Sequence, residues 1–172
     1  KTKTKDLMFS VSLELILNVA HREAVVRRNT HLTLEHLLYA LAHDPEGERI
    51  LESCAADLQL LRQTLDEFLD TLETFGKGHA AREPTQTLGF RRVLQTAVLH
   101  VQSSGKDEVR AGDVLAAILQ QPKAYAAQLL EIQGITRLDI LNYISHGISK
   151  VPLVNGNRDS EPSIAASGQE GE

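Results

Sequence analysis

The chain has 172 residues, of which 42% are hydrophobic, and it carries a formal net charge of −5 at pH 7. This length predicts one domain with a helical, largely aliphatic core, and the acidic balance argues against a nucleic-acid-binding surface, which needs a basic patch. No run approaches the roughly 18 apolar residues of a membrane helix, we expect no signal peptide, and the single cysteine fits a reducing, cytoplasmic location.

The first half of the chain predicts four helices. Apolar residues recur at helical spacing in four segments, namely residues 12–28, 34–43, 49–53 and 56–72. Thr33 is placed to cap the second helix, and Pro45 follows its end because proline disfavours helix in the residue before it. On the last helix, Asp66, Glu67 and Asp70 are expected to form a solvated face.

The second half repeats this organisation after a linker, which we place at residues 76–86 because glycine, proline and polar residues break the periodicity there. Four more helices are predicted, over residues 87–104, 111–120, 123–133 and 136–145. Thr87 should cap the first of them and Gly105 should follow its end. Residues 151–172 contain few large apolar side chains, so they are predicted to be disordered. Residues 1–7 are expected to be a tag or disordered.

An internal repeat relates the two halves. Residues 30–45 return as residues 107–122 at a shift of 77 positions (45 to 122), without a gap. Upstream, the same shift superposes the apolar positions of residues 13–24 on those of residues 90–101. One register that matches a helix, a linker, a second helix and a terminating proline predicts two similar four-helix units.

Sequence signals for catalysis or cofactor binding are weak. Gly105 and Lys106 lack the first glycine and the hydroxyl of a phosphate-binding loop, so we expect no nucleotide cofactor in these residues. Cys54 could in principle act as a nucleophile with one of the histidines, but a small packed residue is the favoured interpretation. His31 and His36 are five residues apart across a helix cap and the remaining histidines are scattered, so no metal site is predicted.

Five segments resemble a known family in their order along the chain: residues 33–41, 58–65, 90–98, 100–109 and 137–147. They look like the N-terminal domain, or double Clp repeat, of Hsp100 Clp ATPases, and residues 100–105 with residues 144–147 resemble the ClpA type in particular. The resemblance covers about residues 8–150. It implies an all-α fold of eight helices in two pseudo-twofold-related Clp repeats, which we place at residues 8–75 and 87–150.

The function that this resemblance implies is non-catalytic. In ClpA-type unfoldases the domain docks the adaptor ClpS and recruits protein substrates, which the unfoldase delivers to the ClpP peptidase. The tail would then link to an absent ATPase module that binds ATP, and the parent would be a hexamer although the isolated domain is monomeric. The family's adaptor-facing positions correspond here to Glu35, Thr87 and Arg92.

Each of these positions also has a plainer interpretation. Glu35 in a first helical turn complements the helix dipole, Thr87 is a helix cap, and Arg92 is a solvated residue whose repeat partner is Leu15. The chain departs from the family at Asn29 and Thr30, where relatives carry His-Glu, which removes one acidic adaptor contact and one potential metal ligand.

Three other functions stay open. A second binding function is direct capture of unfolded protein in an apolar groove without an adaptor. A hydrolase using Cys54 and a helix-turn-helix DNA-binding protein belong to different classes, and the net charge disfavours the latter.

Overall fold

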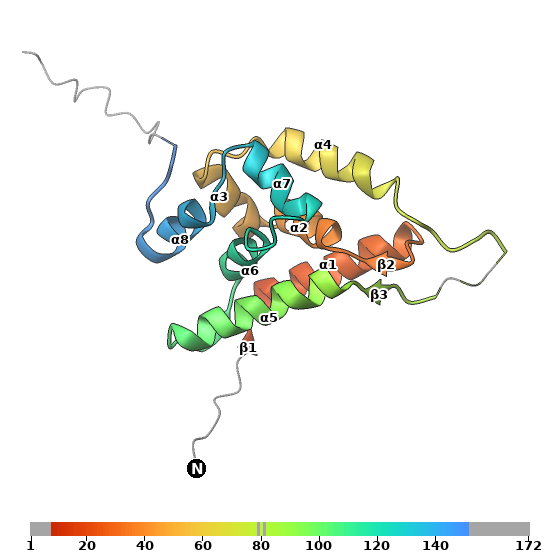
Figure 1. Ribbon diagram of the computed structural model, residues 1–172, viewed down its shortest axis with the longest axis horizontal. Coiled ribbons are helices and arrows are strands. Elements are labelled where there is room, and N and C mark those ends of the chain that lie inside the picture. Colours follow the sequence, from red (N-terminus) through yellow and green to blue (C-terminus); the bar gives the residue numbers. More distant parts are fainter. Residues whose placement is uncertain (1–7, 79, 81, 152–172) are drawn as a thin grey trace, which may run out of the picture.

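The computed structural model describes residues 8–78, 80 and 82–151, so the predictions for residues 1–7 and 152–172 lie outside the described residues. The predicted all-α class is confirmed (Figure 1). The helices are α1 Val11–Val26, α2 Leu34–Ala42, α3 Pro45–Ser53, α4 Leu58–Leu69, α5 Leu88–Ser103, α6 Ala111–Ile118, α7 Tyr125–Ile132 and α8 Arg137–His146. Within the described ranges, no helix is long and apolar enough to cross a membrane.

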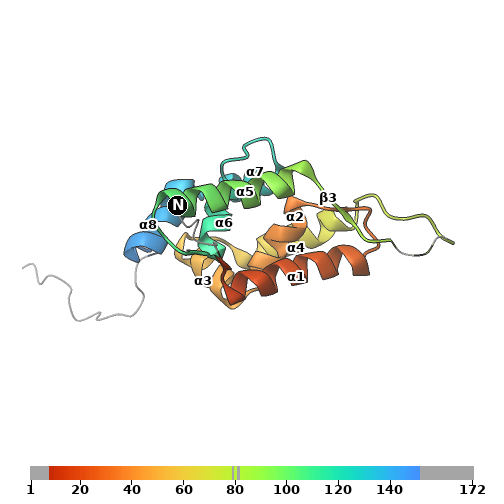
Figure 2. The ribbon, with the colours of Figure 1, turned by 90° about the horizontal axis from the view of Figure 1, so that it is seen from below.

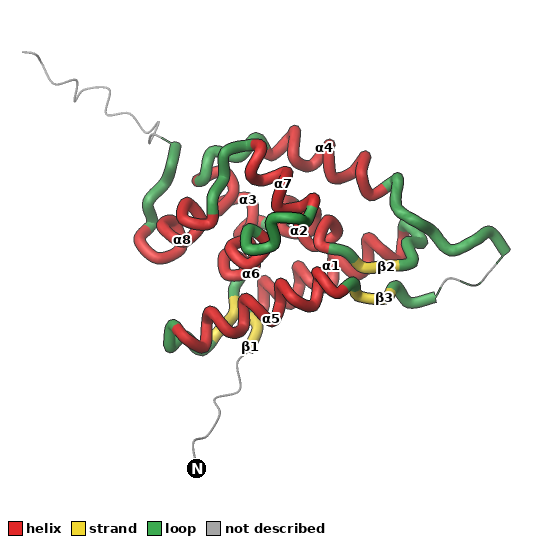
Figure 3. The backbone as a smooth tube through the Cα atoms, viewed as in Figure 1, coloured by secondary structure: helices red, strands yellow, loops and turns green. Residues whose placement is uncertain are grey.

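Four short strands tie the two repeats together, and they appear as the yellow segments of Figure 3. They are β1 Met8–Phe9, β2 His31–Leu32, β3 Thr85–Gln86 and β4 Glu108–Val109. β1 pairs with β4 and β2 pairs with β3, both in parallel, with Met8 opposite Glu108 and His31 opposite Thr85. A shift of 77 positions turns one pair into the other, so the register shows the pseudo-twofold relation directly. Each two-stranded sheet therefore contains one strand from the first half of the chain and one from the second half.

These strands were not predicted. Two residues are too short to show the alternation of side chains that marks a strand. Residues 85–86, which sequence analysis placed in the linker, form β3 instead.

Helices α2 and α6 form the centre of the molecule. All eight residues of α6 are buried, and in α2 only Glu35 and Tyr39 are partly exposed. Figure 2 shows α1 and α5 on opposite sides of this central pair. α4 packs on α2 and α8 packs on α6, which repeats the same arrangement in each half. Burial of these aliphatic side chains is the main source of stability, at about 25 cal/mol per Å² of apolar surface.

Side-chain caps define where most of the helices begin. Six helices start at a capping side chain, provided by Ser10, Thr33, Asp44, Asp57, Thr87 and Thr136. The caps predicted at Thr33 and Thr87 are confirmed. The predicted start of the third helix at residue 49 is wrong, because Asp44 caps α3 and Pro45 occupies its first position, where proline loses no hydrogen bond.

The solvated face predicted for Asp66, Glu67 and Asp70 is confirmed, since all three residues are exposed. Two of them are also paired: Arg27, directly after the end of α1, reaches Asp66 at 2.5 Å and Asp70 at 2.7 Å, and it pairs with Glu23 of α1 at 3.0 Å. The guanidinium lies 5.5 Å from the ring centroid of Tyr39. These contacts join α1 to α4, a relation that the charge run alone did not indicate.

Candidate functional site

The paired strands β2 and β3 bring the N-termini of α2 and α5 together. The backbone N–H of Thr87 donates to the carbonyl of Leu32 at 3.0 Å, so the caps Thr33 and Thr87 follow directly from adjacent strands. A cavity of about 350 Å³ lies between them. Its lining residues are Thr30, His31, Thr33, Leu72, Glu73 and Thr87. This surface, formed by the first turns of α2 and α5 with β2 and β3, is called the α2–α5 surface below.

Thr87 caps α5 from the edge of this cavity. Its hydroxyl accepts the N–H of Phe90 at 3.2 Å, and the side chain is half-buried. Phe90 is fully buried, so the cap also fixes where the apolar face of α5 meets the core.

Replacing Thr87 by Ala should lower the free energy of unfolding by about 1 kcal/mol, because one N–H of the first turn loses its acceptor. Thr87→Ser keeps the hydroxyl and should stay within about 0.5 kcal/mol of the wild type. Urea unfolding followed by far-UV circular dichroism measures both. Equal loss in the two variants would mean that the methyl group, and not the cap, stabilises α5.

Arg92 lies one turn further along α5. Its side chain is exposed and makes no ion pair with any described residue. Leu88, four residues earlier on the same helix, is 56% exposed. Leu88 and Arg92 therefore place one apolar and one charged side chain, both exposed, on the first two turns of α5.

The side chain of Glu35, unlike those of Thr87 and Arg92, contacts α7. It stands in the first turn of α2, but its carboxylate accepts the N–H of Ala126 in α7 at 3.3 Å. Ala124, at the start of α7, provides no side-chain cap, so Glu35 satisfies a donor of that helix from outside. Burial raises the pKa of Glu35, and the hydrogen bond from Ala126 opposes this effect. Thr87 and Arg92 share one helix end at the α2–α5 surface, while the Glu35 side chain turns toward α7.

Comparison with known proteins identifies the fold. Residues 8–133 match the family described as the Clp repeat (R) N-terminal domain. The chain belongs to this family. A curated relative, the ClpA homolog protein of Fuscovulum blasticum, is 40% identical over 151 residues, which are 87% of this chain and 19% of the relative. The chain therefore spans about a fifth of that relative's length.

Two solved structures share the fold of this Clp N-domain. The Hsp104 N-terminal domain from Candida albicans has a TM-score of 0.66 and 16% identity, over 77% of this chain and 86% of that one. A ClpV N-domain in complex with a VipB peptide has a TM-score of 0.64 and 20% identity, over 80% of this chain and 85% of that one. At these identities the likeness concerns the fold alone.

His36 is a structural residue of this Clp N-domain that sequence reasoning missed. The backbone N–H of Thr33 donates to Nδ1 of His36 at 3.0 Å, so Nδ1 is the acceptor and the ring proton is on Nε2. Nε2 then donates to Oδ1 of Asn29 at 2.9 Å, and the amide of Asn29 donates to the carbonyl of Glu73. His36 thus replaces the usual Glu or Gln of a capping box. Asn29, noted as a departure from the family, is buried and anchors this arrangement.

Cys54 is poorly suited to nucleophilic chemistry in this domain. It is 1% exposed, and burial, assisted by the charge of Asp139, raises the pKa of its thiol to about 11. A thiolate, which is the reactive form, is therefore scarce at pH 7. The described residues also include no group of three His, Cys, Asp or Glu side chains that could hold a metal ion.

Proposed function

We propose that this Clp N-domain recruits proteins for a ClpA-type ATP-dependent unfoldase, and that it docks the adaptor ClpS on the α2–α5 surface. The parent would be a hexameric ATPase that passes substrates to ClpP. The observation that carries the proposal is the convergence of two helix starts at one cavity, followed on the next turn of α5 by the exposed Arg92, which forms no ion pair with any described residue. The 40% identity to a ClpA homolog supports the same parent.

The chemistry of this surface suits a folded adaptor with an acidic group. The guanidinium of Arg92 is planar and can bind a carboxylate through two parallel hydrogen bonds. Leu88 supplies exposed apolar area next to it, and Thr87 supplies a hydroxyl at the rim of the cavity. Glu35 contributes by linking α2 to α7 through its hydrogen bond with Ala126. It also places a negative charge in the first turn of α2. Recruitment needs no nucleotide in this domain.

Replacing Arg92 by Glu should weaken binding of ClpS by about 1–3 kcal/mol, because one charged hydrogen-bond donor becomes a repelling carboxylate. Isothermal titration of the isolated domain with ClpS, without nucleotide, measures the loss. The matched control is Arg91→Glu, which makes the same charge change at the neighbouring exposed position, about 100° around the helix. It should cost less than 1 kcal/mol.

Two results would contradict this proposal. Equal affinity of ClpS for the wild type and for Arg92→Glu would mean that ClpS docks on another surface. Absence of binding by the wild type would overturn the adaptor assignment. The thermal midpoint should not change in either variant, since both side chains are exposed.

A second candidate function, direct capture of unfolded protein, is favoured by a separate apolar hollow. Phe9, Leu94, Gln95, Val98 and Leu99 line a shallow cavity of about 460 Å³. Leu99 is 64% exposed, so the hollow offers apolar surface to a partner. A ClpV N-domain of the same fold was solved in complex with a VipB peptide, which supports this candidate. Capture at this hollow would be insensitive to Arg92→Glu, which separates the two functions.

A further inference from the structure

An apolar stripe runs along the outward face of α1. All of its members are at least 42% exposed, and they are Val11, Leu15, Val19 and Val26. At about 100° per residue, the four side chains lie within about 80° of one another around the helix. The buried residues of α1 lie on its opposite face, and they are Leu13, Ile16, Ala20 and Ala24. Figure 2 shows α1 along one edge of the molecule, so the stripe faces away from the core.

Packing of the domain does not require this stripe. The shift of 77 positions relates three of its four members to polar residues of α5, with Leu15 matched to Arg92, Val19 to Thr96 and Val26 to Ser103. α5 packs on α6 as α1 packs on α2, with these polar residues in place. Contiguous exposed apolar surface that the fold does not need is typical of a protein–protein contact.

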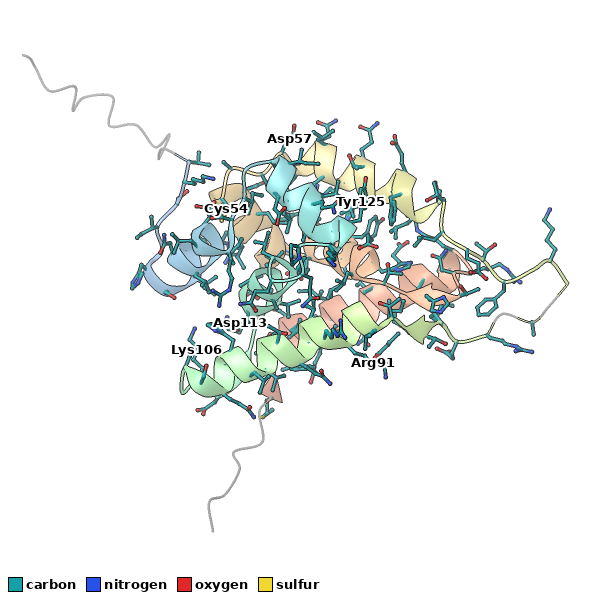
Figure 4. All side chains as sticks on the ribbon, viewed as in Figure 1. Cys54, Asp57, Arg91, Lys106, Asp113 and Tyr125 are labelled. Atoms are coloured by element: carbon teal, nitrogen blue, oxygen red, sulfur yellow. The ribbon has the colours of Figure 1, made fainter. Side chains whose placement is uncertain are left out.

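Two opposite charges and an amide lie along the same face of α1. Glu14 and Arg22 are exposed and form no ion pair with any described residue. Asn18, also exposed, lies four residues from each of them. The order acid, amide, base becomes base, amide, acid when the helix is reversed, so this face is complementary to a second copy of itself. α5 lacks this property, because it has no acidic residue and carries Arg91, labelled in Figure 4, where α1 has Glu14.

The shape of the stripe suits a helix and not an extended peptide. It is the convex ridge of α1, and it lies outside both cavities described above. The backbone N–H and C=O groups within a helix bond to each other, so an extended chain finds no hydrogen-bond partners there. A second helix can pack its own ridge of side chains against this one, with the two axes about 8–10 Å apart.

We propose that α1 pairs with α1 of a second copy of this domain, antiparallel and about a twofold axis at Asn18. Glu14 of each copy then faces Arg22 of the other, so two ion pairs form. Val11 lies seven residues before the axis and Val26 eight residues after it, so each packs on the other in the second copy. The same patch serves both copies, as a twofold contact requires.

The inference rests on the proposed function, because this contact is weak. One pair of helices buries less surface than the roughly 1,200–2,000 Å² of a stable complex, so the dilute domain is monomeric. Copies tethered to one hexamer have an effective concentration on the order of 1 mM, at which a weak contact becomes populated. Six tethered domains would then form three pairs.

Sedimentation equilibrium of the full chain, at concentrations up to about 1 mM, measures the pairing. We expect the average mass to rise from 19.0 kDa toward twice that value and no further. Leu15→Glu should weaken pairing at least about tenfold, because it buries a carboxylate against apolar side chains. The matched control is Leu60→Glu on α4, which changes a leucine of similar exposure, 52% against 57%, and should leave pairing unchanged.

Two further pairs of variants test the antiparallel arrangement. Glu14→Arg should weaken pairing about threefold or more, and adding Arg22→Glu should restore it to within about twofold, because the two charges exchange places. Asn18→Cys should form a disulfide-linked dimer under air oxidation, since the two thiols meet at the axis. Gln95→Cys, the exposed repeat partner on α5, should not form this dimer, and the buried Cys54 takes no part.

Four results would overturn the proposal. They are a mass that stays at 19.0 kDa, equal pairing of Leu15→Glu and Leu60→Glu, failure of the charge exchange to restore pairing, and cross-linking of Gln95→Cys as readily as Asn18→Cys. Titration of Leu15→Glu with ClpS tests the proposed function separately, because Leu15 lies near the start of α1 and outside the α2–α5 surface. Wild-type affinity for ClpS without pairing, or pairing without ClpS binding, shows which of the two proposals has failed.

Discussion

Gly47→Ala should destabilise the domain by about 3 kcal/mol or more, the largest single effect that we expect. A Cβ at this position would lie 2.0 Å from the carbonyl oxygen of Leu41 and 2.8 Å from its carbonyl carbon. Both are backbone atoms of the buried helix α2, so no side-chain rotation relieves the clash and α3 must move away. The gain in helix propensity, about 1 kcal/mol, does not offset this. The thermal midpoint should fall by roughly 10 °C.

Gly89→Ala is the matched control for this change. Its new Cβ would meet only Leu34, with Cδ1 at 3.4 Å, which is ordinary contact with a movable side chain. Since both glycines stand in the first turn of a helix, intrinsic helix propensity favours alanine in each. Gly89→Ala should be neutral or stabilising by up to about 1 kcal/mol. Similar midpoints for the two variants, measured by calorimetry, would show that α3 shifts freely on α2.

Acid should destabilise the domain through His36, by up to about 3 kcal/mol between pH 6.5 and pH 4. Burial, and secondly the positive charge of Arg27, lower the pKa of His36 from 6.5 to about 4 in the folded state. In the unfolded chain the imidazole binds a proton near pH 6.5, whereas the folded chain binds it only near pH 4. The unfolded state binds more protons within this window, so stability falls as the pH falls.

His36→Gln isolates this effect. A glutamine at the third position of α2 keeps the capping-box geometry and cannot titrate. Glu35, whose pKa is raised by burial, contributes a slope of opposite sign in both proteins, so it cancels in the difference. Urea unfolding from pH 4 to pH 7.5 should show the wild type losing stability relative to the variant below pH 6.5. Parallel profiles would mean that His36 accepts a proton in the folded state without cost.

The candidate site was predictable in part. The cap at Thr87 followed from its place before an apolar helical repeat, and Arg92 was expected to be solvated because it lies off the apolar stripe. The contact of Glu35 with α7 was not predictable, because Ala126 lies 91 residues further along the chain. Its adaptor role stays a prediction, as do those of Thr87 and Arg92.

The sequence alone determined the helical class, most helix limits and the repeat of 77 positions, because helix periodicity, capping and chain reversal depend on neighbours within a few residues. The tertiary structure decided what joins the repeats. The exchange of two-residue strands, the ion pairs of Arg27 and the requirement for glycine at Gly47 all arise where distant segments meet.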